Sequence, residues 1–170
     1  EHSNYERALE GLDNLNNEQI ANAKFEMAYC YFNLKMLKEA KPLFSEIQQL
    51  NESKYYLSAN YYYGFISYYD HLYDQALKSF KIVEKDEAYS NIVPYYIAEI
   101  YYFQQKKDAS LKYAESIPNK SELFYANELN QLMGQIYFEK ELYAKAYPLL
   151  ENYIKNTNKV SKEIVYELSY

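Results

Sequence analysis

Small residues recur along this 170-residue chain at intervals of about 35 residues, and this recurrence limits the possible folds more than any other feature. One series consists of Ala28, Gly64, Ala98 and Gly134, with Ser169 as a weaker fifth member. A second series consists of Ala8, Ala40, Ala76, Ala109 and Ala146. A bulky residue follows each member of the second series by one helical turn, in the order Leu12, Phe44, Phe80, Tyr113 and Leu150. Self-similarity with this period indicates an array of structural repeats.

Close helix packing explains why a small and a bulky residue recur together. Two helices approach each other only where one presents Gly or Ala, and a large side chain one turn away fills the neighbouring groove. Around Ala76, the apolar residues Tyr73, Phe80 and Val83 recur at helical spacing, while lysine and aspartate occupy the other face. We therefore predict repeated antiparallel helix pairs, each of which must stack on its neighbours to cover its apolar stripe.

The repeat phase sets the expected boundaries. We expect a single array over residues 1–170, with full repeats at about 21–52, 53–89, 90–118 and 120–157 and partial repeats at 1–18 and 160–170. Because both ends cut through a repeat, we expect the natural array to be longer. The turn near 104–108 is expected to be one residue shorter than the others, since Ala109 follows Ala98 more closely than Ala40 follows Ala28.

The phase of the repeat also predicts where the four prolines lie. Pro94 is expected in the first turns of a helix, and Pro118 is expected to end one. Pro42 and Pro148 occupy equivalent positions, each two residues after the alanine of its repeat. We expect both near the start of a second helix, where a missing amide is tolerated best.

Composition and charge argue against several classes of function. A net charge of -6 with mixed signs provides no basic surface for nucleic acid, and no apolar run is long enough to span a membrane. Only His2 and His71 could supply imidazole, so neither a metal cluster nor a catalytic triad is predicted. The 3 glycines form no phosphate-binding loop, and Cys30, the only cysteine, is expected to pack on a helix. We expect no cofactor and no enzymatic activity.

The spacing of these residues resembles the tetratricopeptide repeat. The quartets that carry the resemblance are Ala28/Tyr31/Ala40/Phe44 and Gly134/Tyr137/Ala146/Leu150, with Gly64/Ala76/Phe80 between them. The tryptophan of that family is absent, and Ser67 replaces its usual aromatic residue. The resemblance implies an all-α, right-handed superhelical solenoid of stacked antiparallel helix pairs. Segments such as 28–34 and 93–102 also look like long repeat proteins of the bacterial cell envelope, which would imply an exported scaffold.

The resemblance also implies a site. In the tetratricopeptide family the first helix of each pair lines a concave groove that binds a peptide or protein. The matching candidates here are Phe25, Tyr29, Phe32, Asn33, Tyr61, Phe65, Tyr68, Tyr69, Tyr95, Glu99 and Tyr102. Phe25, Tyr29 and Tyr62 stand where one variant of the family carries a clamp for a carboxylate, so no such clamp is expected.

Two hypotheses for function remain open at this stage. In the first, the groove binds a protein or peptide partner, and the module is a non-enzymatic interaction scaffold. In the second, the array is an architectural spacer or self-assembling segment that associates through its end helices, and its 24 tyrosines and 8 phenylalanines serve packing alone.

Overall fold

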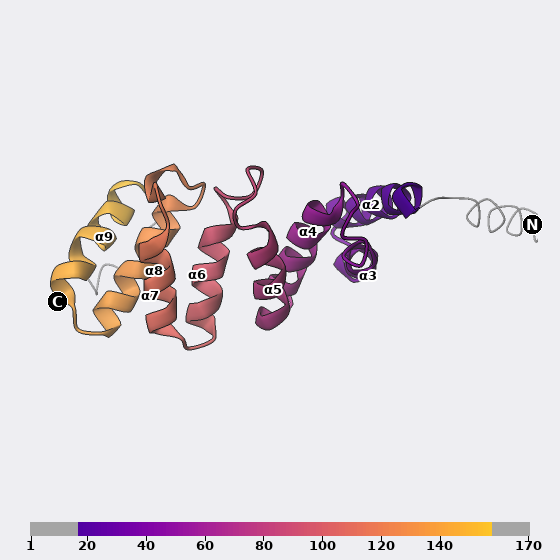
Figure 1. The fold of residues 1–170 in the computed structure, drawn as a ribbon. Helices are drawn as coiled ribbons and strands as arrows, with labels where there is room; N and C mark the ends of the chain where they lie inside the picture. Colours follow the sequence, from indigo (N-terminus) through magenta and orange to yellow (C-terminus); the bar gives the residue numbers. More distant parts are fainter. Residues whose placement is uncertain (1–16, 158–170) are drawn as a thin grey trace, which may run out of the picture. The chain divides into compact units, whose positions relative to one another are not determined.

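A computed structural model describes residues 17–157, and the described part of the chain consists of α-helices, one short 3-10 helix and connecting turns (Figure 1). No strand occurs within residues 17–157, so the predicted all-α fold class is confirmed. The contacts divide the chain at residues 83 and 84 into two compact units, which are described separately. The partial repeats expected at 1–18 and 160–170 lie outside the described residues, except that Asn17 and Glu18 begin the first described helix.

The described part of each unit contains two antiparallel helix pairs. In unit 1 these are formed by α2 (Asn17–Asn33), α3 (Leu37–Ile47), α4 (Tyr56–Tyr69) and α5 (Tyr73–Val83). In unit 2 they are formed by α6 (Val93–Phe103), α7 (Lys107–Ser116), α8 (Ala126–Glu139) and α9 (Tyr143–Lys155), with the 3-10 helix η1 (Lys120–Glu122) between α7 and α8. In each unit both pairs are in contact internally, and the second pair packs against the first through α3 and α4 or through α6, α7 and α8. The predicted stacking of helix pairs is therefore confirmed within each unit.

The small residues lie where two helices of a pair approach most closely. Gly64 and Ala76 are both buried, and a Cβ atom added to Gly64 would lie 3.0 Å from the ring of Phe80. In the last pair, a Cβ atom added to Gly134 would lie 2.7 Å from Cγ and Cδ2 of Leu150. The bulky residue therefore occupies the space that the missing side chain leaves, as the sequence pattern predicts.

The core of each unit is built from the predicted stripes. In unit 1 the buried cluster joins Ala28, Ala40, Phe44, Ile47, Ala59 and Ile66. In unit 2 it extends from Ala98 and Leu111 through the apolar residues of α8 to Ala146 and Leu150. Burial of these side chains supplies the main driving force for holding the pairs together.

All four helix pairs share one turn geometry. Lys35, His71, Gln105 and Glu141 each have a positive φ, between 59° and 63°. In the second pair the amide of His71 donates to the Tyr68 carbonyl, at 3.0 Å, and the amide of Leu72 donates to the Ser67 carbonyl, at 2.8 Å. This is the Schellman arrangement, which caps the carbonyl groups at the end of the first helix. Glycine usually occupies this left-handed position, and here four larger residues do.

The third pair corrects one prediction. Gln105 lies the same distance after Ala98 as Lys35 lies after Ala28, so its turn is not shorter than the others. In the first turn of α7, Ser110 is fully buried and its hydroxyl donates a 2.7 Å hydrogen bond to the carbonyl of Ala98, whereas Ala109 is only partly buried. Ser110 is therefore the equivalent of Ala40 and Ala76. The sequence pattern favours Ala109 because the other members of its series are alanines, although serine is nearly as small.

The prolines are placed correctly in two of four cases. Pro94 lies in the first turn of α6, and Pro118 follows the end of α7. Pro42 and Pro148, by contrast, lie inside α3 and α9, beyond the first turn, so the prediction of a position near the helix start is wrong. Both are exposed, and each leaves one interior carbonyl of its helix without the usual amide donor.

Candidate functional site

Most of the candidate residues of unit 1 form one continuous set of aromatic contacts. On α2, the Phe25 ring stacks on Tyr55 with centroids 4.7 Å apart, and Tyr29 meets Tyr62 edge to face at 5.6 Å. On the same helix, Phe32 contacts Tyr62 at 4.9 Å. Helix α2 therefore presents its aromatic side chains to the first helix of the next pair, α4, as well as to solvent.

Tyr62 is the residue that connects the two helices, and sequence reasoning did not select it for this role. Its ring lies 5.2 Å from Phe44 in the core and 5.2 Å from Tyr61. No motif distinguishes Tyr62 from Tyr61 or Tyr63 in the run of three tyrosines. Only the packing of α4 on α2 and α3 decides which of them is central.

The remaining candidates continue this surface along α4. Phe32 contacts Phe65 at 5.7 Å, Phe65 contacts Tyr69 at 4.8 Å, and Tyr68 contacts Tyr69 at 5.6 Å. We name the set the aromatic face; its members are Phe25, Tyr29, Phe32, Tyr61, Tyr62, Phe65, Tyr68 and Tyr69. Asn33, the last residue of α2, is exposed, and its side chain makes no hydrogen bond to a described residue.

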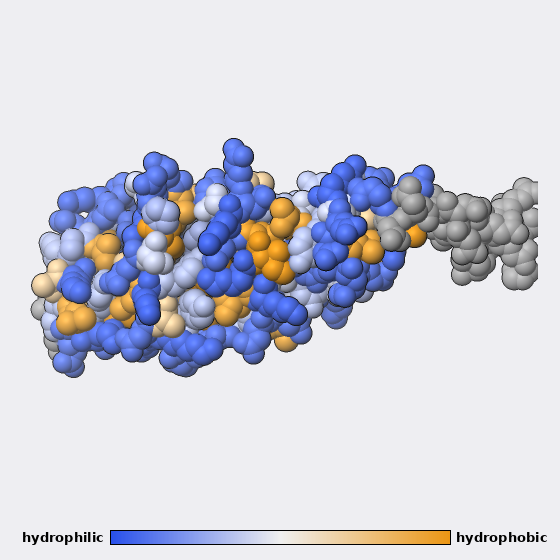
Figure 2. Space-filling view, in the orientation of Figure 1, coloured by the Kyte–Doolittle hydropathy of each residue, from blue (hydrophilic) through white to orange (hydrophobic). Residues whose placement is uncertain are grey.

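Exposure differs along the aromatic face. Tyr29 is 40% exposed and Tyr69 is 55% exposed, whereas Phe25, Phe32 and Phe65 are half-buried. The two tyrosines therefore reach solvent, and the phenylalanines support them from below. The visible surface in Figure 2 is mainly hydrophilic, with hydrophobic residues reaching it in separate patches.

The candidates of unit 2 make polar contacts at two places, where Tyr95 bonds to Glu99 and where Tyr102 belongs to a network around Glu139. The Tyr95 hydroxyl donates to Oε1 of Glu99 at 2.7 Å, and the Tyr95 ring lies 4.9 Å from that of Tyr125. The Tyr102 hydroxyl donates to Oε1 of Glu139, at 2.9 Å, and accepts from Nε2 of Gln135, also at 2.9 Å.

Glu139 is the centre of this network. Lys107, which sequence reasoning did not include, places Nζ 2.7 Å from Oε2 of Glu139. Partial burial by itself would raise the pKa of Glu139, but the hydrogen bonds from Lys107, Tyr102 and Gln135 outweigh it and lower the pKa below its usual value. The carboxylate is thus held ionised, and its charge is paired with that of Lys107.

Two further tyrosines in unit 2 donate to carboxylates. The Tyr113 hydroxyl donates to Oε2 of Glu84 at 2.8 Å, and the Tyr137 hydroxyl donates to Oε1 of Glu115. Burial and the neighbouring carboxylate both disfavour the phenolate, so the pKa of Tyr113 is raised and that of Tyr137 rises to about 12. Both phenols are therefore protonated at neutral pH and can donate these hydrogen bonds.

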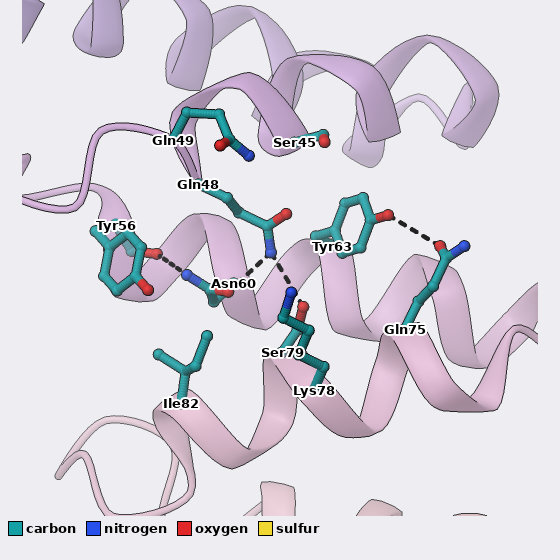
Figure 3. A pocket seen from close by; sticks show the side chains of 10 residues that line it. All are labelled: Ser45, Gln48, Gln49, Tyr56, Asn60, Tyr63, Gln75, Lys78, Ser79 and Ile82. Carbon is teal, nitrogen blue, oxygen red and sulfur yellow. Dashed lines mark hydrogen bonds between the residues drawn. The ribbon is translucent and has the colours of Figure 1, made fainter.

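A separate polar cleft lies among α3, α4 and α5, where the sequence analysis predicted nothing (Figure 3). It has a volume of about 430 Å³. Amide and hydroxyl side chains predominate among its lining residues, which are Ser45, Gln48, Gln49, Tyr56, Asn60, Tyr63, Gln75, Lys78, Ser79 and Ile82. No local sequence signal marks the cleft, because Gln48, Asn60 and Ser79 come together only when α3, α4 and α5 pack.

Other sequence predictions have mixed outcomes. His71 lies exposed in its turn, as expected, with Nδ1 2.9 Å from the hydroxyl of Tyr73. Cys30 lies on α2 but is exposed there, so the expectation that its side chain packs is wrong. Between residues 17 and 157, no group of three or more His, Cys, Asp or Glu residues is arranged to hold a metal ion. Over the same range, no helix combines the length and the apolar character that crossing a bilayer requires.

No protein-family model matches this sequence, and no curated protein is similar to it at a significant level.

Proposed function

We propose that this chain is a non-enzymatic interaction module of the tetratricopeptide type, which binds a peptide or protein segment through the aromatic face of unit 1. The observation that carries the proposal is the continuity of that face. Ring contacts run from Phe25 through Tyr62 to Tyr69, and Tyr29 and Tyr69 stand exposed above them.

The mechanism is preorganisation. Tyrosine is enriched among the residues that dominate binding energy, because a large rigid ring is buried with little loss of conformational entropy and its hydroxyl can still form a hydrogen bond. Phe25 contacts Tyr29 and Phe65 contacts Tyr69, and these contacts hold the two exposed rings in place. The rings therefore lose little conformational entropy when a partner binds.

One observation favours a second candidate, an architectural role. Phe32 and Tyr62 contact each other and, through Phe44, the core of unit 1. Packing between helix pairs therefore accounts for part of the aromatic content without any partner. In this alternative the array acts as a spacer or associates with further copies of itself through its end helices.

A peptide selection distinguishes the two. Random peptides displayed on phage are selected on the immobilised chain, and the selected peptides are tested against a variant that carries Tyr29→Ser and Tyr69→Ser. The matched control is Tyr147→Ser, because Tyr147 is 53% exposed but lies on α9, outside the aromatic face. We expect the double variant to bind at least about 10-fold more weakly, since hot-spot residues contribute about 2 kcal/mol or more, and we expect the control to bind as the parent chain does.

Equal binding by the parent and the double variant would remove the aromatic face from the site. If no peptide is selected and light scattering shows mass rising with protein concentration, the architectural role is the better account.

A further inference from the structure

The polar cleft of Figure 3 is independent of the aromatic face, because the two lie on different sides of α4. An α-helix has 3.6 residues per turn, so Tyr56, Asn60 and Tyr63 share one side. Phe65 and Tyr61 project from roughly the opposite side by the same spacing. A ligand in the cleft would therefore contact a surface that the proposed interaction role does not use.

The floor of the cleft is a hydrogen-bonded node that joins three helices. Nε2 of Gln48, which follows α3, donates to Oδ1 of Asn60 on α4 at 2.8 Å and to Oγ of Ser79 on α5 at 3.0 Å (Figure 3). Nδ2 of Asn60 donates in turn to the carbonyl of Tyr56 at 2.9 Å. Asn60 is 1% exposed and Ser79 is 3% exposed, so these polar groups are held in place before any ligand binds.

The node leaves complementary hydrogen-bonding capacity directed at the cleft. The Gln48 amide uses both of its protons in these bonds, but its Oε1 accepts no hydrogen bond from a described residue. The Ser79 hydroxyl accepts a hydrogen bond from Gln48 and still has its own proton to donate. On the far wall, the Tyr63 hydroxyl donates to Oε1 of Gln75 at 2.9 Å, which leaves Nε2 of Gln75 as a donor beside a phenolic oxygen that can accept. Donors and acceptors thus occur as adjacent pairs.

Adjacent donor–acceptor pairs match hydroxyl groups, because each hydroxyl donates one hydrogen bond and accepts others. A peptide main chain carries its donors and acceptors on separate groups, which bind best to an extended ladder such as a sheet edge. No carboxylate lines the cleft, and Lys78 at the rim is its one charged lining residue. The exposed side chain of Ile82 and the ring of Tyr63 add apolar surface, which suits the C–H faces of a sugar ring.

From this chemistry we propose that the cleft is a binding site for a neutral saccharide of one or two sugar rings. Its volume of about 430 Å³ falls in the range of small-molecule sites, which extends from about 300 to 1,000 Å³. The sugar hydroxyls would pair with Gln48, Ser79 and Gln75, and the preformed node would fix their orientation.

The test is saturation-transfer NMR on the whole chain, with glucose, galactose, mannose, N-acetylglucosamine and their 1,4-linked disaccharides. Side-chain amide signals of Gln48, Asn60 and Gln75 are followed in the same samples. We expect saturation to pass from the protein to the C–H protons of at least one sugar, with shifts of these amide signals. The variant Gln75→Ala is expected to weaken that binding about 10-fold.

The matched control is Glu39→Ala, because Glu39 directly precedes Ala40 as Gln75 precedes Ala76, yet it does not line the cleft. Gln75 and Glu39 are both exposed, so neither substitution should affect folding. Absence of saturation transfer for every sugar at 20 mM (about twenty times a millimolar dissociation constant), with the cleft amides unshifted, would overturn the proposal. Sugar binding that is unchanged in Gln75→Ala would also overturn the proposal. The same holds if a capped tetra-alanine peptide shifts the amide signals and none of the sugars does.

Discussion

The contact between Gly134 and Leu150 leads to a prediction in which the effect of one substitution changes sign. A Cβ atom added to Gly134 would lie 2.7 Å from Cγ and Cδ2 of Leu150, well inside the separation of about 3.5–4.0 Å that two carbon atoms prefer. Overpacking of this kind costs about 1–3 kcal/mol. Alanine in a helix is favoured over glycine by about 1 kcal/mol. Gly134→Ala is therefore expected to destabilise the parent chain by about 1 kcal/mol net.

Removing the partner side chain reverses this expectation. Leu150→Ala deletes a buried side chain and is expected to cost about 2–5 kcal/mol. In that background the added methyl group at Gly134 no longer meets Cγ and Cδ2 of Leu150 and keeps an ordinary contact of 3.4 Å with Cβ of Leu149, so the helical preference for alanine should stabilise the protein by about 1 kcal/mol. The two substitutions should thus couple favourably by about 2 kcal/mol, far above the few tenths of a kcal/mol expected of independent sites.

Urea unfolding followed by circular dichroism and by tyrosine fluorescence measures all four members of this cycle. A change of 1 kcal/mol corresponds to about 2–4 °C in Tm for a chain of this size, which a thermal melt can confirm. If Gly134→Ala stabilises the parent chain, or if the coupling is zero, α8 and α9 do not approach through this glycine and our account of the repeat is wrong.

Three further predictions concern single positions. Gln105→Gly should stabilise the chain by about 0.5–1 kcal/mol, because glycine adopts the φ of 61° without steric cost, and a fall in Tm would contradict the strained turn. Ser110→Leu should destabilise the chain by about 1–3 kcal/mol, whereas Ala109→Leu should change its stability little. If urea unfolding shows the larger loss of stability for Ala109→Leu, then Ala109 is the core residue of this helix and our correction is wrong. The pKa of Tyr137 is raised to about 12 from 10.0 in the unfolded chain, so its contribution to stability is present below pH 10 and is lost as pH rises toward 12. In Glu115→Ala, the midpoint of the Tyr137 titration, followed by the ¹³Cζ NMR signal, should move toward pH 10. An unchanged midpoint would contradict the hydrogen bond between Tyr137 and Glu115.

The candidate site was predicted from the sequence only in part. The period placed Phe25, Tyr29 and Phe65 on first helices, where they do lie, because that inference needs only the phase of the repeat. It did not identify Tyr62 as the link between two pairs or Lys107 as the partner of Glu139, since both depend on how neighbouring pairs pack. The polar cleft was missed for the same reason, because Gln48, Asn60 and Ser79 lie far apart in sequence and meet only when three helices stack.

The sequence alone determined that this chain forms helix pairs, because a small residue opposite a bulky one is a local requirement of close helix packing and recurs with every pair. Tertiary structure decided which of two adjacent small residues, Ala109 or Ser110, enters the core, because both are small enough and only the position of the turn at Gln105 sets which one faces α6. It also decided which tyrosines are supports and which reach solvent. Tyrosine suits both environments, so only the neighbouring helices determine how much of each ring remains exposed.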